Sequence, residues 1–311
     1  MNNQLSTNQK KLTEKEMELT YGPSIVRYLW SLLLIRLPNG LCPRCKYPVT
    51  KYYKKLKKER AFICSRCLLH VYPQAGSFLE YSKIEIDDWY KIVYRMLSNR
   101  SGISAHLIHR TFGYSYPTAF RALHLIRKAM GECLVFDLQN SVLEIDGSFI
   151  TTGNKSLGKH YRFKRGRGSE KHTTVLAIVE RKGVCKMFPI HAEDADNVIP
   201  IILKNVPKSN TIYTDSLGAY NKLRELGFEH AAVNHQIEFV NGSASTNSAE
   251  GVFNNLKHTM STFRNVSEEK LPNYLLEESY RVSFRTEHDY GMRRLFESLP
   301  SLELKYGSKA A

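Results

Sequence analysis

The chain has 311 residues, of which 42% are hydrophobic and 11% aromatic, so it can bury a sizeable core across two or three domains. This composition excludes an unfolded chain, and a net charge of +15 favours a polyanionic partner such as nucleic acid. The basic balance alone is weak evidence, because ribosome-binding and membrane-surface proteins share it. The longest apolar stretch, residues 28–35, is too short to span a bilayer, and no signal peptide is recognisable. We therefore expect a cytoplasmic protein with no membrane partner, associated with the nucleoid when it binds DNA.

Two cysteine pairs with the spacing C-x2-C-x18-C-x2-C predict a zinc ribbon. Each CxxC turn places two thiolates at one apex, and a tetrahedral zinc about 2.3 Å from each sulfur closes the site. Four thiolates leave no position for water, so this single zinc is structural. The alternative is four unrelated buried cysteines. The predicted ligands are Cys42, Cys45, Cys64 and Cys67. Cys133 and Cys185 resemble ordinary small apolar residues.

A strongly basic run lies between the two cysteine pairs. Nine Lys or Arg and a single acid, Glu59, occur from Cys42 to Cys67. On a zinc ribbon, beside Tyr52 and Tyr53, this run is expected to grip phosphates. The alternative is a solvated charged face.

The next segment is predicted to be helical. Residues 84–97 carry apolar residues at helical spacing, and residues 102–130 indicate a helix, a tight turn and a second helix. Ser104 is expected to cap the first helix, Gly113 to make the turn, and Ser115 with Pro117 to open the second. The buried positions of the second helix are then Ala119, Leu123, Ile126 and Met130, and the outer ones Thr118, Arg121, His124 and Arg127. This pattern predicts a helix-turn-helix whose second helix enters a major groove, although any two helices joined by a glycine turn look similar.

From residue 140 the pattern changes to strands alternating with helices. Strands are predicted at 142–150, 173–181, 183–192, 210–217 and 231–236, and helices at 194–206, 218–226, 245–258 and 272–285. This order requires a mixed α/β sheet flanked by helices, the RNase H-like fold. Between the first two strands, residues 152–171 hold seven Lys or Arg and four glycines, which indicates a basic loop that orders on DNA or an insertion without contacts.

Three carboxylates on these elements predict a site for two divalent cations. Asp146 lies on the first strand, Asp215 ends the fourth, and Glu250 lies on the helix at 245–258 with Lys257 seven residues further on the same face. Strand ends converge in such sheets. We expect Asp146 to bridge two Mg²⁺ or Mn²⁺ ions, Asp215 and Glu250 to bind one each, and Lys257 to contact a DNA phosphate.

Other residues compete for roles in this site. Asn247, about one turn before Glu250, is the second choice as a ligand. Glu144 shares the strand face of Asp146 and is either a supporting carboxylate or an edge residue. His235 either orients a ligand or is a structural histidine.

The ordered series of motifs resembles bacterial insertion-sequence transposases of the ISXO-type family fifteen-ninety-five. The segments are residues 37–47, the second CxxC, 104–130, 142–150, 212–220 and 246–257. The resemblance implies an RNase H-like catalytic domain with D-D-E or D-D-N chemistry followed by a lysine, and recognition of terminal inverted repeats by the N-terminal part. Asp146, Asp215, Glu250 and Lys257 match the catalytic set, and Asn247 the asparagine of the T-N motif. Ser245 and Phe253 depart from the histidine and tryptophan common in the family.

These features together predict a transposase that cuts and joins double-stranded DNA, both element ends and target, as a homodimer or higher oligomer. The rivals are an inactive or domesticated DNA-binding protein and a plain RNase H-like nuclease. The predicted organisation is a tail and helix at 1–37, a zinc ribbon at 38–80, a helix-turn-helix domain at 81–137, a catalytic domain at 138–300 and a tail at 301–311.

Overall fold

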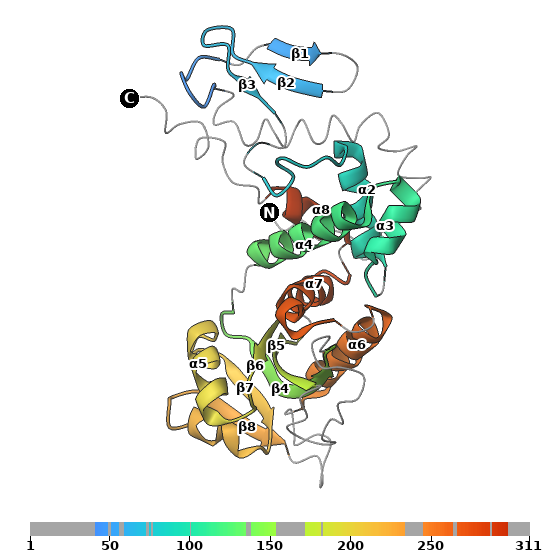
Figure 1. The fold of residues 1–311 in the computed structure, drawn as a ribbon. Coiled ribbons are helices and arrows are strands. Elements are labelled where there is room, and N and C mark those ends of the chain that lie inside the picture. Colours follow the sequence, from blue (N-terminus) through green and yellow to red (C-terminus); the bar gives the residue numbers. More distant parts are fainter. Residues whose placement is uncertain are drawn as a thin grey trace. The chain divides into compact units, whose positions relative to one another are not determined.

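In the computed structural model of the protein, the described residues are 41–48, 51–55, 59–72, 75, 77–99, 101–134, 138–153, 172–181, 183–233, 245–263, 266–286 and 288–297. They belong to two compact units, one of residues 1–92 with 296–311 and one of residues 93–295 (Figure 1). The five-part organisation expected from the sequence stays a prediction. The N-terminal helix, the basic loop after residue 153 and His235 lie outside the described residues.

The first unit contains a small antiparallel sheet in the order β1-β2-β3. The basic run between the cysteine pairs lies on its first hairpin, with Tyr53 opposite Ala61 in the register. The bounds are β1 Lys51–Lys55, β2 Glu59–Ile63 and β3 His70–Val71.

Helix α2 (Ile86–Ser98) follows the predicted helical spacing. Its apolar side chains Trp89, Ile92, Val93 and Leu97 are all buried. Within the first unit, the Trp89 ring lies edge-on to Phe78 with 5.9 Å between ring centroids. The apolar periodicity in the sequence therefore identifies the buried face of α2.

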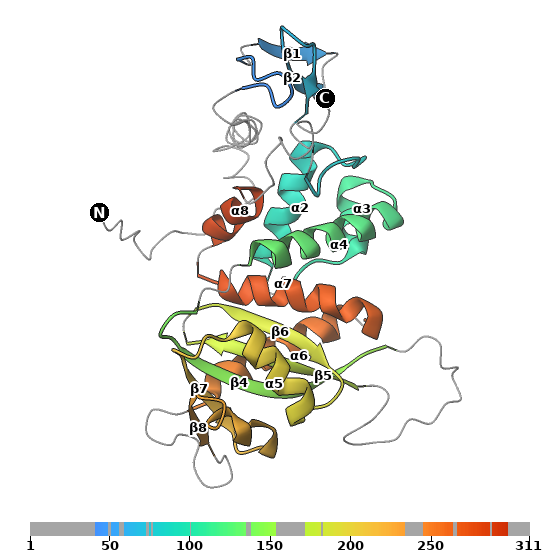
Figure 2. The ribbon, with the colours of Figure 1, turned by 90° about the vertical axis from the view of Figure 1, so that its left-hand side faces the viewer.

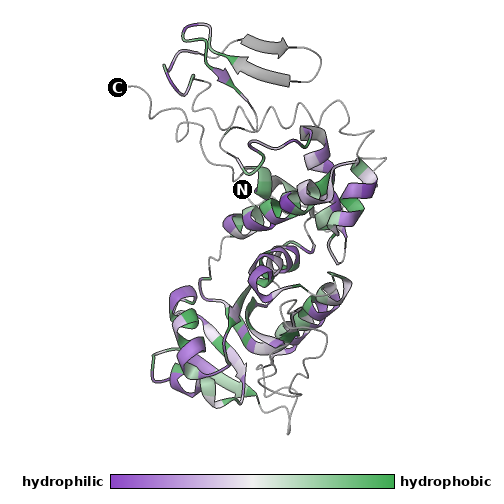
Figure 3. Ribbon diagram, viewed as in Figure 1, coloured by the Kyte–Doolittle hydropathy of each residue, from purple (hydrophilic) through white to green (hydrophobic). Residues whose placement is uncertain are grey.

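The predicted helix-turn-helix is formed by α3 (Ala105–Phe112) and α4 (Tyr116–Cys133). Ser104 caps α3 by accepting a hydrogen bond from the Leu107 amide at 3.2 Å. Gly113 ends α3 with a φ of 75°, in the left-handed region that glycine tolerates best. Ser115 caps α4, and a proline occupies its first turn, as expected. Hydrophilic and hydrophobic residues alternate around these helices (Figure 3).

The outer face predicted for α4 is wrong at Arg127. Arg127 is buried although it was expected to face outward. The residues expected to face inward are buried as predicted: Ala119, Leu123, Ile126 and Met130. Its Nε donates to Glu277 Oε2 at 2.7 Å, and its guanidinium carbon lies 3.8 Å from the centroid of the Tyr274 ring. Both partners belong to α7 (Leu271–Ser283), a helix about 150 residues further along the chain. Of the four residues predicted to face outward, Arg121 is the exposed cation, and Thr118 and His124 are half-buried.

The second unit also holds a five-stranded sheet in the order β6-β5-β4-β7-β8 (Figure 2). The strands β6, β5 and β4 pair antiparallel, while β4, β7 and β8 pair parallel. This is the mixed α/β sheet of an RNase H-like fold, as predicted. Its strands are β4 Val142–Thr151, β5 His172–Glu180, β6 Cys185–Ile190, β7 Thr211–Asp215 and β8 Glu229–Val233.

Helices cover both faces of this sheet. One core joins the sheet to α5 (Ala195–Asn205) and η2 (Gly218–Leu223), and another joins it to α6 (Asn247–Phe263) and α7. Strand β5, which lies between β6 and β4, is buried on both faces, which explains its nearly continuous hydrophobic sequence. The helix predicted at residues 218–226 is a shorter 3₁₀ helix, η2.

After α6, the short 3₁₀ helix η3 (Glu268–Lys270) leads into α7. The described residues end with helix α8 (His288–Glu297), which was not predicted. Among the described residues, no helix is long and apolar enough to cross a membrane.

Replacing Arg127 with methionine is expected to lower the unfolding free energy of the second unit by about 3–5 kcal/mol. The change removes one partner of a buried ion pair and leaves the Glu277 charge in the core, with Arg281 as its nearest remaining cation at 3.7 Å. A urea titration followed by circular dichroism measures the loss. The control is Lys270→Met, which breaks the exposed Lys270–Glu269 pair and should leave the midpoint unchanged. An unchanged midpoint for Arg127→Met would show that the pair is not required.

Candidate active site and metal centre

The two CxxC turns of the first unit have the same backbone geometry. In each turn, the amide of the first cysteine donates to the carbonyl five residues later, at 2.8 Å for Cys42 and 3.0 Å for Cys64. The amide four residues later donates back to that cysteine's carbonyl, at 2.9 Å in both turns. Lys46 and Leu68 occupy equivalent positions with φ values of 57° and 55°. The chain therefore presents two matched pairs of thiols.

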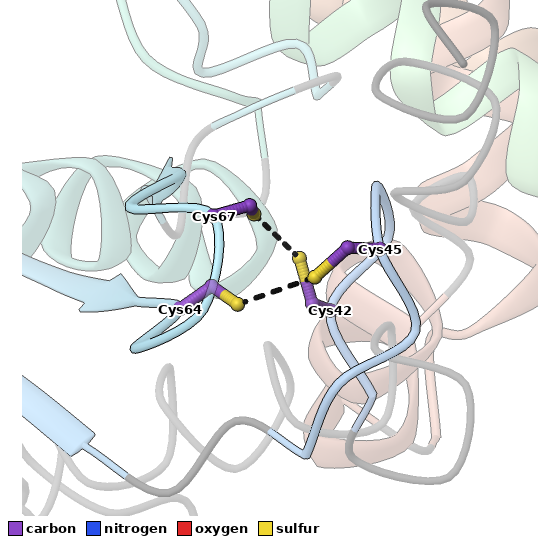
Figure 4. A group of neighbouring side chains, drawn as sticks. All are labelled: Cys42, Cys45, Cys64 and Cys67. Carbon is purple, nitrogen blue, oxygen red and sulfur yellow. Dashed lines mark hydrogen bonds between the residues drawn. The ribbon is translucent and has the colours of Figure 1, made fainter. Parts of the chain in front are cut away.

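The four sulfur atoms converge as a metal site requires (Figure 4). The Sγ atoms of Cys42 and Cys67 lie 3.6 Å apart and those of Cys45 and Cys64 3.5 Å apart, and all four lie within 4.8 Å of one another. Tetrahedral zinc with bonds of about 2.3 Å would separate its sulfur ligands by about 3.8 Å. Burial, aided by the neighbouring thiols, raises the pKa of Cys42 to about 12, so a cation must displace its proton on binding. The predicted ligand set fits zinc.

Adjacent strands bring the two predicted aspartates together. Ile145 of β4 pairs with Thr214 of β7 in parallel register, so Asp146 and Asp215 occupy the next positions, side by side. Asp215 is the last residue of β7, whereas β4 continues beyond Asp146, paired with β5. The pair therefore lies where β7 ends beside the continuing strand β4.

Helix α6 supplies the other two predicted residues. Glu250 lies in its first turn and Lys257 two turns later, and both side chains are exposed. The opposite side of the helix, including Ala249, Val252 and Leu256, is buried against the sheet and α7. The prediction that Glu250 and Lys257 share an exposed helical face agrees with this placement.

The pKa of Asp146 responds to burial and to the charges of other acids. Burial, then the charges of Glu193, Asp215 and Glu250, raise the pKa of Asp146 to about 7. Its Oδ1 accepts a hydrogen bond from the Gly147 amide at 2.8 Å, which offsets only part of this effect. Mutual repulsion among oxygen ligands is the condition that a hard divalent cation relieves.

The carboxylates do not converge as tightly as the cysteines. Among the described residues, the side chains whose possible metal-ligand atoms all lie within 4.8 Å of one another are the four cysteines, and the acids do not form such a group. The charge and the oxygen donors of the acidic group suit Mg²⁺ or Mn²⁺, but the assignment of Asp146, Asp215 and Glu250 as its ligands stays a prediction.

The sequence reading missed Glu193, the carboxylate whose charge acts most strongly on Asp146. Tyr220 is fully buried and donates its hydroxyl to Glu193 Oε1 at 2.7 Å. Burial, then the Glu193 charge, raise the pKa of the Tyr220 phenol, so it remains a donor. A Cβ on Gly147 would lie 2.2 Å from the Glu193 carboxyl carbon, so only glycine permits this approach. The sequence offers one indication of this contact: Gly147 lies inside a strand directly after Asp146, and a glycine in a strand often marks a close approach.

The remaining candidates have different environments. Asn247 is exposed at the start of α6. Glu144 is buried and fully hydrogen-bonded, so it is not a simple edge residue. Cys133 and Cys185 are buried among apolar side chains, as expected of small core residues.

Residues 137–283 match the ISXO2-like transposase domain. A protein in the transposable element ISH50 of Halobacterium salinarum is 26% identical over 78% of this chain and 86% of its own length. A transposase-like protein of Haemophilus influenzae is 25% identical over 32% of this chain and 82% of its own length. The fold is also similar to a chain in the crystal structure of a pre-cleavage Mos1 transpososome. The similarity covers 71% of this chain and 79% of that chain, with 11% sequence identity and a TM-score of 0.29.

The matched residues contain all four predicted catalytic residues, Asp146, Asp215, Glu250 and Lys257. The match begins after α4, so the cysteine site and the helix-turn-helix lie outside it. It also includes Glu193, which was not predicted for the site, and Glu144, which was predicted to be either a supporting carboxylate or an edge residue.

Proposed function

We propose that this protein cuts the ends of its insertion sequence and joins them to target DNA. The observation that supports the proposal is the placement of Asp146 and Asp215 on paired strands, with the charge of Glu250 acting on Asp146, in residues that match a transposase domain. Phosphodiester transfer requires charge neutralisation on the entering and leaving oxygens. An acidic group at the open end of a strand pair suits that need.

In this proposal Asp146, Asp215 and Glu250 hold two Mg²⁺ or Mn²⁺ ions. The ions, when bound, activate an attacking oxygen and stabilise the leaving one. Asp146, whose pKa is raised by the charges of both other acids, is assigned to both ions, while Asp215 and Glu250 would each bind one. Lys257, exposed on the same helix as Glu250, binds a DNA phosphate near the reacting strand. The 3′-OH released by hydrolysis then attacks target DNA, with no covalent protein–DNA intermediate.

We assign recognition of the terminal inverted repeats to the part of the chain before the transposase domain. The exposed start of α4, with Tyr116, Pro117 and Arg121, is the segment available to a major groove. One structural zinc holds the ribbon whose β1–β2 hairpin carries the basic run. Because two ends must be joined together, we expect a dimer or higher oligomer on DNA.

The test uses the DNA that flanks the gene, whose inverted repeats would define the element ends. With Mg²⁺, the full-length protein is expected to nick these ends and then form strand-transfer products. Asp215→Asn should slow nicking at least about a hundredfold, because a lost metal ligand removes several kcal/mol of charge stabilisation. Asp196→Asn is the matched control, since Asp196 is an exposed aspartate in the first turn of α5.

Each rival gives a different result in this assay. End binding without nicking, even with Mn²⁺, would indicate a DNA-binding protein that has lost its nuclease activity. Nicking without strand transfer would indicate a plain nuclease. Full-rate cleavage by the Asp215→Asn variant would remove Asp215 from the site.

A further inference from the structure

Glu144 caps a helix that starts more than a hundred residues later in the chain. Its carboxylate is 1% exposed, and Oε2 accepts hydrogen bonds from the amides of Ser248 and Ala249 at 2.6 and 3.2 Å. These amides lie in the first turn of α6, where intrahelical acceptors are lacking. A carboxylate at this position also interacts favourably with the helix dipole, and bonds to a charged acceptor are the stronger kind.

Arg181 holds the same carboxylate from the other side. Its Nε donates to Glu144 Oε1 at 2.7 Å, and its Nη2 donates to the Ser245 hydroxyl oxygen at 2.6 Å. The guanidinium carbon lies 4.9 Å from the centroid of the Tyr213 ring on β7. The backbone amide of Arg181 donates to the Val142 carbonyl of β4 at 3.1 Å. Arg181 therefore joins the end of β5, two neighbouring strands and the residues that lead into α6.

These contacts lie next to the catalytic acids on both sides. Glu144 and Asp146 are two residues apart on β4, so their side chains point to the same face of the sheet. Ala249, which donates to Glu144, directly precedes Glu250. One buried carboxylate thus connects the strand of Asp146 to the helical turn of Glu250.

We infer that Glu144 and Arg181 are positioning residues that fix the distance between Asp146 and Glu250. This inference rests on the proposed function, since it concerns the same acidic site. Glu144 does not bind the cations itself, because both of its oxygens are occupied by the α6 amides, Arg181 and Ser245. Its role is to hold α6 so that Glu250 faces Asp146 before the cations arrive. Without this anchor, cation binding would have to order the first turn of α6 as well.

The decisive variant is Glu144→Gln, which keeps the shape of the side chain but removes its charge. Supporting groups around metal ligands commonly change metal affinity or activity by about 10–100-fold when replaced. We therefore expect the Mn²⁺ concentration for half-maximal binding and the Mg²⁺ concentration for half-maximal cleavage to rise at least about tenfold. Arg181→Met, which leaves the α6 amide contacts of Glu144 in place, should show a smaller rise. Glu229→Gln is the control, because Glu229 is an exposed carboxylate at the start of β8 that accepts a hydrogen bond from the Thr211 hydroxyl at 2.8 Å.

A second readout needs neither DNA nor metal. Hydrogen exchange of a peptide that covers residues 245–256 should become faster in metal-free Glu144→Gln and stay unchanged in Glu229→Gln. Peptides from β5 and α5 should keep their protection, which separates a local release of α6 from general unfolding.

The outcomes separate this inference from the proposed function. Unchanged hydrogen exchange in α6 would show that Glu144 does not anchor this helix. Faster exchange with unaltered Mn²⁺ binding would show that Glu144 does not position the cation site. If the wild-type protein fails to cut element ends, the proposed function fails, while exchange and Mn²⁺ binding still decide the role of Glu144. Faster exchange in α6 together with weaker Mn²⁺ binding supports the inference.

Discussion

Removal of zinc from the native protein is expected to unfold the small sheet of the first unit and to leave the sheet of the second unit intact. The three strands β1, β2 and β3 comprise 5, 5 and 2 residues, too few to bury a core of their own. The four sulfur atoms of this region lie within 4.8 Å of one another, so a bound metal would supply the cross-links that a core would otherwise provide. Structural zinc sites typically contribute about 10–16 kcal/mol of apparent binding free energy at pH 7.

Elemental analysis and hydrogen exchange together measure this effect. The native protein should contain one zinc per chain, and a strong chelator should expose the amides of residues 41–71 without altering those of β5. Release should be faster at low pH, because protons compete with the metal for thiolates such as that of Cys42, whose pKa burial raises. Cys42→Ser should lose the metal at once.

The matched control is Cys133→Ser, which alters a buried cysteine outside the cluster. This variant should retain one zinc per chain, whatever its cost to the core around α4. Native protein without zinc, or with freely titrating thiols at all four positions, would contradict the assignment of a zinc ribbon.

Local chemistry made much of this molecule predictable from its sequence. The cysteine spacing, the caps at Ser104 and Ser115 and the turn at Gly113 depend on residues within a few positions of one another. The order of strands and helices along the chain followed from β-rich and helical patterns and from turn residues. The RNase H-like arrangement then placed Asp146 beside Asp215 without knowledge of any distance.

The failures concern contacts between segments that are remote in the chain. Arg127 looks solvent-exposed by helical periodicity, because nothing nearby shows that Glu277 of α7 will cover it. Glu193 belongs to no motif and reaches Asp146 only through the fold. Helix α8 was missed although its apolar residues Met292, Leu295 and Phe296 are buried on one face, because it is short and polar on average. For Arg127 and Glu193 the missing information is a tertiary partner rather than a local preference.

Asp146→Asn is expected to abolish DNA cleavage while making the metal-free protein more stable at pH 8. Burial, then the charges of Glu193, Asp215 and Glu250, raise the pKa of Asp146 from 3.8 to about 7. The folded state therefore holds the proton more tightly than the unfolded chain. The stability that this group contributes is fully present below pH 3.8 and is lost as the pH rises through about 7.

Above pH 7 the ionised carboxylate lowers the unfolding free energy by roughly 2–4 kcal/mol, since each tenfold change in proton affinity is worth about 1.4 kcal/mol. Asparagine keeps the size of the side chain and can still accept the bond from the Gly147 amide. Denaturation in the absence of metal should thus show a gain for the variant at pH 8 and almost none at pH 4. Asp196→Asn, at an exposed aspartate, should show neither change.

Adding Mg²⁺ should reverse the order of stability. Cations that bind only the folded protein raise its stability, so the wild-type midpoint should climb with Mg²⁺ while the midpoint of the Asp146→Asn variant stays flat. Cleavage of element-end DNA by the variant should fall about a thousandfold or more, because Asp146 is assigned to both ions. An equal response of both proteins to Mg²⁺, or a loss of stability at pH 8, would mean that repulsion among these acids is not what the cations relieve. A cation site differs in this respect from an ordinary acidic surface. Its carboxylate lowers the stability of the metal-free protein, yet the metal-bound protein requires it.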